Sequence, residues 1–215
     1  MERLPQGYEV HRQFLPLDAV ARLRASIGSQ SVLFQHVRPK AGMNLPYRVV
    51  DGNDVRELLP DVYALVTGPL HAALQEAAGV PLELMRDRKR AIRIQRYQGR
   101  SEGLRWHLDG GLFSILLTLV NTNGGSTEII GRDLSRRLKW VPYLLFPFAG
   151  VLERFPREAV VSEPGDLILM HGGVTIHRGT NPRDDGERLV LVASFDPRDR
   201  APTPVWDWFA RRLNY

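Results

Sequence analysis

The part of the sequence that follows Pro81 is built from seven short apolar or alternating runs separated by turn-forming residues. Each run has the length of a β-strand, and the clusters of Gly, Pro, Asn and Asp between them are typical of turns. The runs cover residues 91–97, 112–120, 127–130, 159–162, 167–170, 174–177 and 189–195. Many short strands with tight turns, preceded by helices, predict a β-sandwich or jelly roll.

Helical patterning is confined to the two ends of the sequence. Near the N-terminus, four apolar residues recur at helical spacing and fall on one face: Leu17, Val20, Leu23 and Ile27. A second helix is predicted over residues 61–78, with a break or kink at Gly68-Pro69, because proline removes a backbone donor. A short closing helix is expected over residues 206–213.

The length of 215 residues is typical of one compact domain with a sizeable core. We therefore expect a single domain over residues 1–215, of the α+β or mainly β class. Residues 1–80 are expected to form a mostly helical support, and residues 91–197 the jelly-roll core.

Composition narrows the partners and the compartment. The net charge is +5, but arginine supplies 26 of the 29 basic residues and is spread along the chain, so a nucleic-acid partner is not expected. The sequence has no cysteine, which excludes disulfides and thiolate metal sites. Residues 1–5 do not resemble a signal peptide, and the longest apolar run, 140–152, is too short to cross a bilayer. We expect a cytoplasmic protein without a membrane partner; a homodimer is possible.

Three residues supply the ligands of a mononuclear non-haem Fe(II) site, which are two imidazoles and one carboxylate. His107 and Asp109 are two positions apart, so on an extended segment their side chains point to the same face. His177 follows Asp109 by 68 residues, and a jelly roll brings such distant strands together. The alternative is that His107 caps a turn, Asp109 begins the next turn and His177 is a core histidine.

Arg188 follows His177 with ten residues between them. The pattern of His107, Asp109, the distal histidine and this arginine resembles the Fe(II)/2-oxoglutarate-dependent dioxygenase superfamily. Further matching segments are Arg96-Tyr97, residues 163–169 and residues 186–191, so the resemblance covers about half of the chain. Residues 123–128 and Asn181-Pro182 are most similar to the phytanoyl-CoA-type and small-metabolite hydroxylase branches.

The resemblance implies a double-stranded β-helix that binds Fe(II), 2-oxoglutarate and O2. It implies that His107, Asp109 and His177 are the metal ligands, and that Arg188 pairs with the distal carboxylate of 2-oxoglutarate. A planar guanidinium forms two parallel hydrogen bonds with a carboxylate, which lysine cannot do. The reaction implied is hydroxylation of a substrate with release of succinate and CO2.

His171 competes with His177 as the distal ligand. The position that follows His171 with ten residues between them is Pro182, which cannot bind a carboxylate. The spacing within the family also favours His177, so we interpret His171 as a core residue or as a neighbour of the site.

Several other residues are candidates for the pocket. Arg93 and Tyr97 share one polar face of the strand at residues 91–97 and are expected to contact 2-oxoglutarate or substrate, although that face could also be solvated. Thr118 and Thr127 are possible hydroxyl donors to 2-oxoglutarate, although threonine is common in strands for propensity alone. The remaining candidates are two aromatic residues that either line the pocket or belong to the core: Trp106 and Phe113.

Two segments have no assigned role. The basic residues Arg86, Arg88, Lys89 and Arg90 are interpreted as a solvated loop that could attract an anionic substrate. Residues 140–148 are rich in aromatic and apolar side chains, and a lid, a dimer contact and ordinary core remain open for them.

Three functions are compatible with these residues. The first is hydroxylation of a C–H bond in a small molecule, such as an amino acid, a carboxylic acid or a natural-product intermediate. The second is demethylation of alkylated bases, but such enzymes carry a second arginine six residues after the first, where this chain has Ser194. The third is a jelly-roll binding protein without turnover, and the full set of ligands argues against it.

Overall fold

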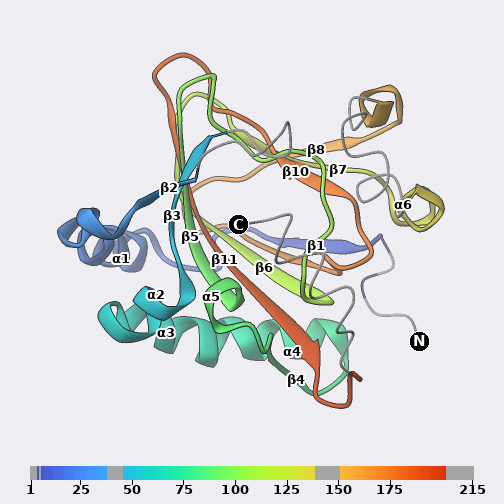
Figure 1. Ribbon diagram of the computed structural model, residues 1–215, viewed down its shortest axis with the longest axis horizontal. Helices are drawn as coiled ribbons and strands as arrows, with labels where there is room; N and C mark the ends of the chain where they lie inside the picture. Colours follow the sequence, from blue (N-terminus) through green and yellow to red (C-terminus); the bar gives the residue numbers. More distant parts are fainter. Residues whose placement is uncertain (1–3, 5, 38–45, 139–150, 202–215) are drawn as a thin grey trace.

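A computed structural model describes residues 4, 6–37, 46–138 and 151–201 of the chain. Two antiparallel sheets form a jelly roll (Figure 1). The larger sheet has the order β1-β9-β6-β11-β5-β3-β2, with β4 paired to one end of β11, and the smaller sheet has the order β10-β7-β8. No helix in the described residues is long and apolar enough to cross a membrane.

Apart from β4, which no predicted run covers, the strands after Pro81 follow the predicted runs closely. The strands of the larger sheet in this region are β4 (Leu82–Leu84), β5 (Ile92–Gln98), β6 (Phe113–Asn121), β9 (Leu167–Met170) and β11 (Glu187–Pro197). The smaller sheet contains β7 (Ser126–Ile129), β8 (Glu158–Val161) and β10 (His177–Gly179). The predicted jelly roll is confirmed.

One predicted strand was displaced. The run at residues 174–177 was expected to be extended, but β10 begins only at His177. The backbone N–H groups of Val174 and Thr175 both donate to the carbonyl oxygen of His171, which closes these residues into a turn. The apolar side chains that suggested a strand are therefore in a turn next to it.

The N-terminal support contains helices and three strands that the sequence pattern did not indicate. The helices and helical turns are α1 (Leu17–Ser29), a 3-10 turn (Ser31–Leu33), α2 (Gly52–Leu58), α3 (Pro60–Leu65), a π segment (Val66–Leu70) and α4 (His71–Ala78). The strands are β1 (Tyr8–His11), β2 (Gln35–Val37) and β3 (Tyr47–Val50), and they form the two ends of the larger sheet. The support is thus part of the sheet as well as a cover for it.

The predicted break in the second helix is confirmed. Helices α3 and α4 are joined by the π segment, in which Gly68 has φ −105° and ψ −106°, immediately before Pro69. Gly79 ends α4 in the left-handed conformation, with φ +70°, where an L side chain would be strained. The predicted closing helix at 206–213 and the segment 140–148 lie outside the described residues.

The two faces of the larger sheet pack against different partners. On β6, Ile115, Leu117 and Leu119 face the core shared with the N-terminal helices, and Figure 1 shows α3 and α4 along that side. Leu116 belongs to a second core with Ile129 of the smaller sheet. Because side chains alternate along a strand, the second face is turned toward the space between the sheets, where the candidate site lies.

The basic segment at residues 86–90 differs from its interpretation as a solvated loop. Residues Arg88–Ala91 form the short helix α5, and Arg90 is buried. Its Nε donates to Asp87 Oδ2 at 2.9 Å, which compensates for the burial of the charge. Arg86, Arg88 and Lys89 are exposed, as expected.

Candidate metal and co-substrate site

His107, Asp109 and His177 converge at one point between the two sheets. His107 Nε2 lies 3.5 Å from Asp109 Oδ1, and His177 Nε2 lies 3.5 Å from Asp109 Oδ2. The three potential ligand atoms lie within 4.8 Å of one another, and no other such group occurs in the described residues. Atoms bound at about 2.1 Å to one ion are typically about 3–3.5 Å apart, so this spacing fits a single divalent metal.

The backbone accounts for this convergence. His107 and His177 form an isolated antiparallel bridge, in which each N–H donates to the other residue's carbonyl oxygen at 2.9 and 3.1 Å. The N–H of Asp109 donates to the carbonyl oxygen of Gly172 at 3.0 Å. The intervening Leu108 packs away from the site, in a small buried core. The expected shared face of His107 and Asp109 is therefore present.

Hydrogen bonds orient each ligand. His107 Nδ1 lies 2.8 Å from the carbonyl oxygen of Arg105, and His177 Nδ1 lies 2.9 Å from that of Thr175. A carbonyl oxygen only accepts, so both Nδ1 atoms carry the hydrogen and both Nε2 atoms present a lone pair. Ser114 Oγ donates to Asp109 Oδ2 at 2.6 Å. This is the arrangement of outer hydrogen bonds that metal-binding histidines and carboxylates require.

The protonation states also suit a metal. Burial alone would raise the pKa of the Asp109 carboxyl, but the two neighbouring imidazoles and Arg93 hold that pKa well below its ordinary value. Burial lowers the pKa of the His177 imidazole to about 4. At neutral pH the site therefore offers an ionised carboxylate and a neutral buried imidazole.

A pocket with both polar and apolar walls opens from the three ligands toward β5 and β11. It is lined by the ligands together with Arg93, Gln95, Tyr97, Leu104, Leu116, Gly179, Arg188, Val190 and Val192. Arg188 is opposite Tyr97 in the pairing of β11 with β5, and Val192 is opposite Arg93. Arg93 and Arg188 are therefore four residues apart along the strand direction, which corresponds to about 13 Å between their backbone positions.

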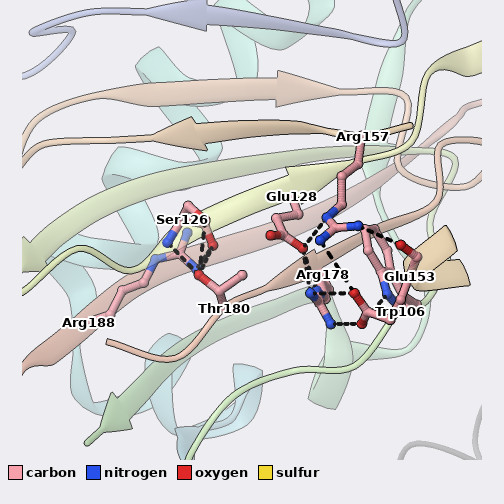
Figure 2. Close-up of polar contacts among 8 residues, drawn as sticks. All are labelled: Trp106, Ser126, Glu128, Glu153, Arg157, Arg178, Thr180 and Arg188. Carbon is pink, nitrogen blue, oxygen red and sulfur yellow. Dashed lines mark hydrogen bonds and ion pairs between the residues drawn. The ribbon is translucent and has the colours of Figure 1, made fainter. Parts of the chain in front are cut away.

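Arg188 is fully buried, and its guanidinium is held by the smaller sheet. Its Nη1 donates to the carbonyl oxygen of Ser126 at 3.0 Å (Figure 2), and its Nη2 donates to Thr127 Oγ1 at 2.7 Å. Its Nε has no hydrogen-bond partner among the described residues. Burial lowers the pKa of Arg188, although arginine stays charged in proteins. A buried cation that has no carboxylate partner in the described part of the chain suits an anionic ligand.

Two glycines make room for this side chain. A Cβ atom on Gly125 would lie 2.8 Å from Arg188 Cδ, and one on Gly179 would lie 3.0 Å from Arg188 Nη1. Gly179 also lies beside Tyr97, whose hydroxyl donates to Gln95 Oε1 at 2.6 Å. The guanidinium position thus depends on the absence of side chains on both β10 and the loop before β7.

The structure gathers most of the predicted residues, in different ways. Arg93 and Tyr97 line the pocket, so their face of β5 is turned toward the site. Thr127 contacts Arg188, whereas the Thr118 hydroxyl lies 2.7 Å from Ser162 Oγ and does not line the pocket. Their roles in binding 2-oxoglutarate remain predictions.

The other aromatic and histidine candidates are not pocket residues. Trp106 packs in the small core behind the ligands, with Leu108 and Ile176. Phe113 stacks on His171 with ring centroids 4.5 Å apart. His171 lies outside the ligand group, which supports the choice of His177.

Two neighbours of the ligands, Ser114 and Gly172, were not predicted from the sequence. Ser114 hydrogen-bonds Asp109, and a Cβ on Gly172 would lie 2.2 Å from Asp109 Oδ2. Gln95 is buried and lines the pocket, and its Nε2 has no hydrogen-bond partner among the described residues. Gln95 was predicted, since it shares the polar face of its strand with Arg93 and Tyr97, whereas Ser114 and Gly172 carry no signal of their own in the sequence.

Comparisons with known proteins identify the fold. The epimerase SnoN, solved with Fe3+, alpha ketoglutarate and nogalamycin RO, is 18% identical, with a TM-score of 0.71 over 98% of this chain and 86% of its own. A Pseudomonas putida prolyl-4-hydroxylase is 18% identical, with a TM-score of 0.60 over 90% of this chain and 94% of its own. HygX from Streptomyces hygroscopicus, solved with nickel, 2-oxoglutarate and hygromycin B, is 15% identical, with a TM-score of 0.66 over 91% of this chain and 84% of its own.

These similarities show that the chain has the jelly-roll fold of iron- and 2-oxoglutarate-dependent oxygenases. A scan against protein-family models and a search of curated proteins found no match.

Proposed function

We propose that this protein is an Fe(II)- and 2-oxoglutarate-dependent oxygenase that hydroxylates a C–H bond of a small-molecule metabolite. The observation that carries the proposal is the shared pocket of His107, Asp109, His177 and Arg188. A metal triad alone would fit other metal sites, and a buried arginine alone would fit any anion. Together they fit a metal that binds one end of a dicarboxylate while the guanidinium holds the other end.

Each residue has a role in this proposal. His107, Asp109 and His177 would hold the metal, and three protein ligands would leave it able to bind further ligands. Arg188 binds the distal carboxylate of 2-oxoglutarate, beside Thr127 and Tyr97. When bound, the iron and 2-oxoglutarate supply the oxidising chemistry that consumes O2 and releases succinate and CO2.

The surrounding protein orients the reactants and limits access of water. The Nδ1 hydrogen bonds keep both imidazoles facing the metal position, and Ser114 holds the carboxylate. Leu116, Val190 and Val192 form an apolar wall of the pocket. Arg93 places a positive charge at the end of the pocket away from Arg188, where it can contact substrate or co-substrate.

The structural neighbours support small-molecule chemistry. Nogalamycin RO is bound in the structure of SnoN and hygromycin B in that of HygX. In addition, Ser194 occupies the position where base demethylases carry a second arginine, and it is buried in β11. Both observations favour a small metabolite over a nucleic acid as substrate.

The test is turnover of 2-oxoglutarate by the iron-loaded protein. Purified protein would be incubated with Fe(II), ascorbate, 2-oxoglutarate and O2, and succinate would be quantified with and without pools of small metabolites. We expect slow succinate formation alone and a rise with the pool that contains the substrate. The Asp109→Ala variant should form none. Equal succinate from the wild type, the variant and a protein-free control would contradict the proposal and leave a binding role.

A further inference from the structure

A charged cluster lies directly behind the metal ligands, on the side turned away from the pocket. We call it the Arg178 cluster, and Figure 2 shows its members: Trp106, Glu128, Glu153, Arg157 and Arg178. Trp106 precedes His107 and Arg178 follows His177. Neighbouring residues on extended segments point to opposite faces, so the two ligands face the pocket while Trp106 and Arg178 meet behind them.

The contacts within this cluster connect the two ligand segments through side chains. The Arg178 guanidinium carbon lies 4.6 Å from the centroid of the Trp106 ring, within the range of a cation–π contact. Trp106 Nε1 donates to Glu153 Oε1 at 3.1 Å, and Arg178 Nη2 donates to Glu153 Oε2 at 3.1 Å. Glu153 therefore accepts hydrogen bonds from both residues, so that Trp106, Arg178 and Glu153 each contact the other two.

Arg178 is also fixed to the smaller sheet. Its Nε donates to Glu128 Oε2 at 2.7 Å, and Glu128 lies opposite Arg178 in the pairing of β10 with β7. The guanidinium therefore has a defined position relative to β7. Because the Trp106 ring stacks on it, the position of Trp106 is defined as well. The cluster links the loop before β6 to the smaller sheet.

This link matters because His107 lies outside the regular strands. Its segment is attached to that of His177 by the two-bond bridge and, nearby, by the N–H of Leu104, which donates to the carbonyl oxygen of Gly179 at 3.0 Å. On its other side the segment is held by the N–H of Asp109, which donates to the carbonyl oxygen of Gly172 at 3.0 Å. Backbone hydrogen bonds thus hold the segment only at Leu104, His107 and Asp109, and we expect side-chain contacts to resist its remaining twist about the bridge. Such twisting would change the separation of the two Nε2 atoms, on which metal binding depends.

We infer that Arg178 is a positioning residue for the metal site: through Glu153 and the Trp106 ring, it fixes His107 relative to His177. The inference rests on the proposed function, because it assigns a purpose to contacts around the proposed metal site. Arg178 itself lines no part of the pocket among the described residues.

Arg157 provides a matched control within the same cluster. Its Nε lies 3.3 Å from Glu128 Oε2, and its Nη2 lies 3.7 Å from Glu153 Oε2, so it contacts the same two carboxylates. It is more exposed than Arg178 and is not adjacent to a ligand. Exposed ion pairs contribute little to stability, and loss of Arg157 should leave the metal site unchanged.

The experiment is a titration of metal-free protein with Co²⁺, followed by visible absorption and by calorimetry. It compares the wild type with Arg178→Gln, Arg178→Lys and Arg157→Gln. We expect the Kd for Co²⁺ to rise on the order of tenfold in both Arg178 variants, as is typical when support of a metal ligand is lost. Lysine should not restore affinity, because it lacks the planar fork and stacks poorly on the indole. Arg157→Gln should bind as the wild type does.

The outcomes separate this inference from the proposed function. Equal Co²⁺ affinity in all four proteins, or an equal loss in the Arg157 and Arg178 variants, would overturn the positioning role while the proposed oxygenase stands. A wild type without saturable Co²⁺ binding would overturn both. If Arg178→Gln fails to fold, Arg178→Lys and Trp106→Phe decide, since phenylalanine keeps a ring but loses the donor to Glu153. Wild-type affinity in both would overturn the inference.

Discussion

Replacement of Arg188 tests the proposed binding of 2-oxoglutarate most directly. Its guanidinium is fully buried, two of its nitrogen atoms are held by Ser126 and Thr127, and no carboxylate is bonded to it among the described residues. Arg188→Lys keeps a positive charge but loses the planar fork, whereas Arg188→Gln loses the charge as well. Both changes should weaken binding of 2-oxoglutarate.

The magnitude follows from the contacts that would be lost. A hydrogen bond to a charged group contributes about 1.5–3 kcal/mol, and about 1.4 kcal/mol corresponds to a tenfold change in affinity. If lysine loses one such bond, the Kd for 2-oxoglutarate should rise roughly tenfold to a hundredfold. Glutamine should cause at least the same loss, because no cation remains to pair with the distal carboxylate.

The assay is direct binding of 2-oxoglutarate to metal-loaded protein without O2, so that the Kd is not mixed with turnover. Arg183→Gln, at an exposed position in the loop before β11, serves as the control. A folded Arg188→Lys protein that binds 2-oxoglutarate within twofold of the wild type would refute the assignment of Arg188. Loss of affinity in the Arg183 variant would show that the effect is one of overall charge.

Three further changes test other parts of the site and its support. Gly172→Ala should abolish Co²⁺ binding, since its Cβ would lie 2.2 Å from Asp109 Oδ2, whereas Gly28→Ala, which meets no atom within 4 Å, should bind normally. Ser114→Ala should raise the Kd for Co²⁺ on the order of tenfold, because it removes the donor to Asp109; an unchanged titration would contradict that role. Asp166→Asn should lower the free energy of unfolding by about 1.5–3 kcal/mol near neutral pH in urea melts, because Asp166 accepts hydrogen bonds from Arg12 and from two backbone N–H groups. Burial alone would raise the pKa of Asp166, but these hydrogen bonds lower it below its value in the unfolded chain. The stabilisation by Asp166 is therefore complete above the unfolded pKa and is lost as pH falls through the folded pKa. A difference in unfolding free energy between the wild type and Asp166→Asn that grew in acid would contradict this.

The sequence predicted the core strands because their signal is local. In β9 and β11, apolar runs bounded by turn residues coincide with the observed strands, and the spacing of His107 and Asp109 gave their common face. The kink at Gly68-Pro69 was also predictable, because it follows from the chemistry of proline itself. Each of these features depends on residues close together in the chain.

Features that depend on distant contacts were not predictable in the same way. Strand β2 has three residues, and its extended form depends on pairing with β3. Burial of Arg90 depends on its position over the Asp109–Gly110 turn, where a Cβ on Gly110 would lie 3.5 Å from Arg90 Nη1. Gly172 was assigned no role from the sequence, because its closeness to Asp109 appears only when the segment after β9 and the loop before β6 are brought together.

The bridge between His107 and His177 has a thermodynamic consequence for the whole molecule. The two residues are 70 positions apart, so an unfolded chain cannot bring both imidazoles to one ion without first closing a long loop. A metal that occupies this site therefore favours the native state over the denatured ensemble. At a free concentration of 100 times its Kd, the stabilisation would be about 2.7 kcal/mol, enough to raise the melting temperature by several degrees.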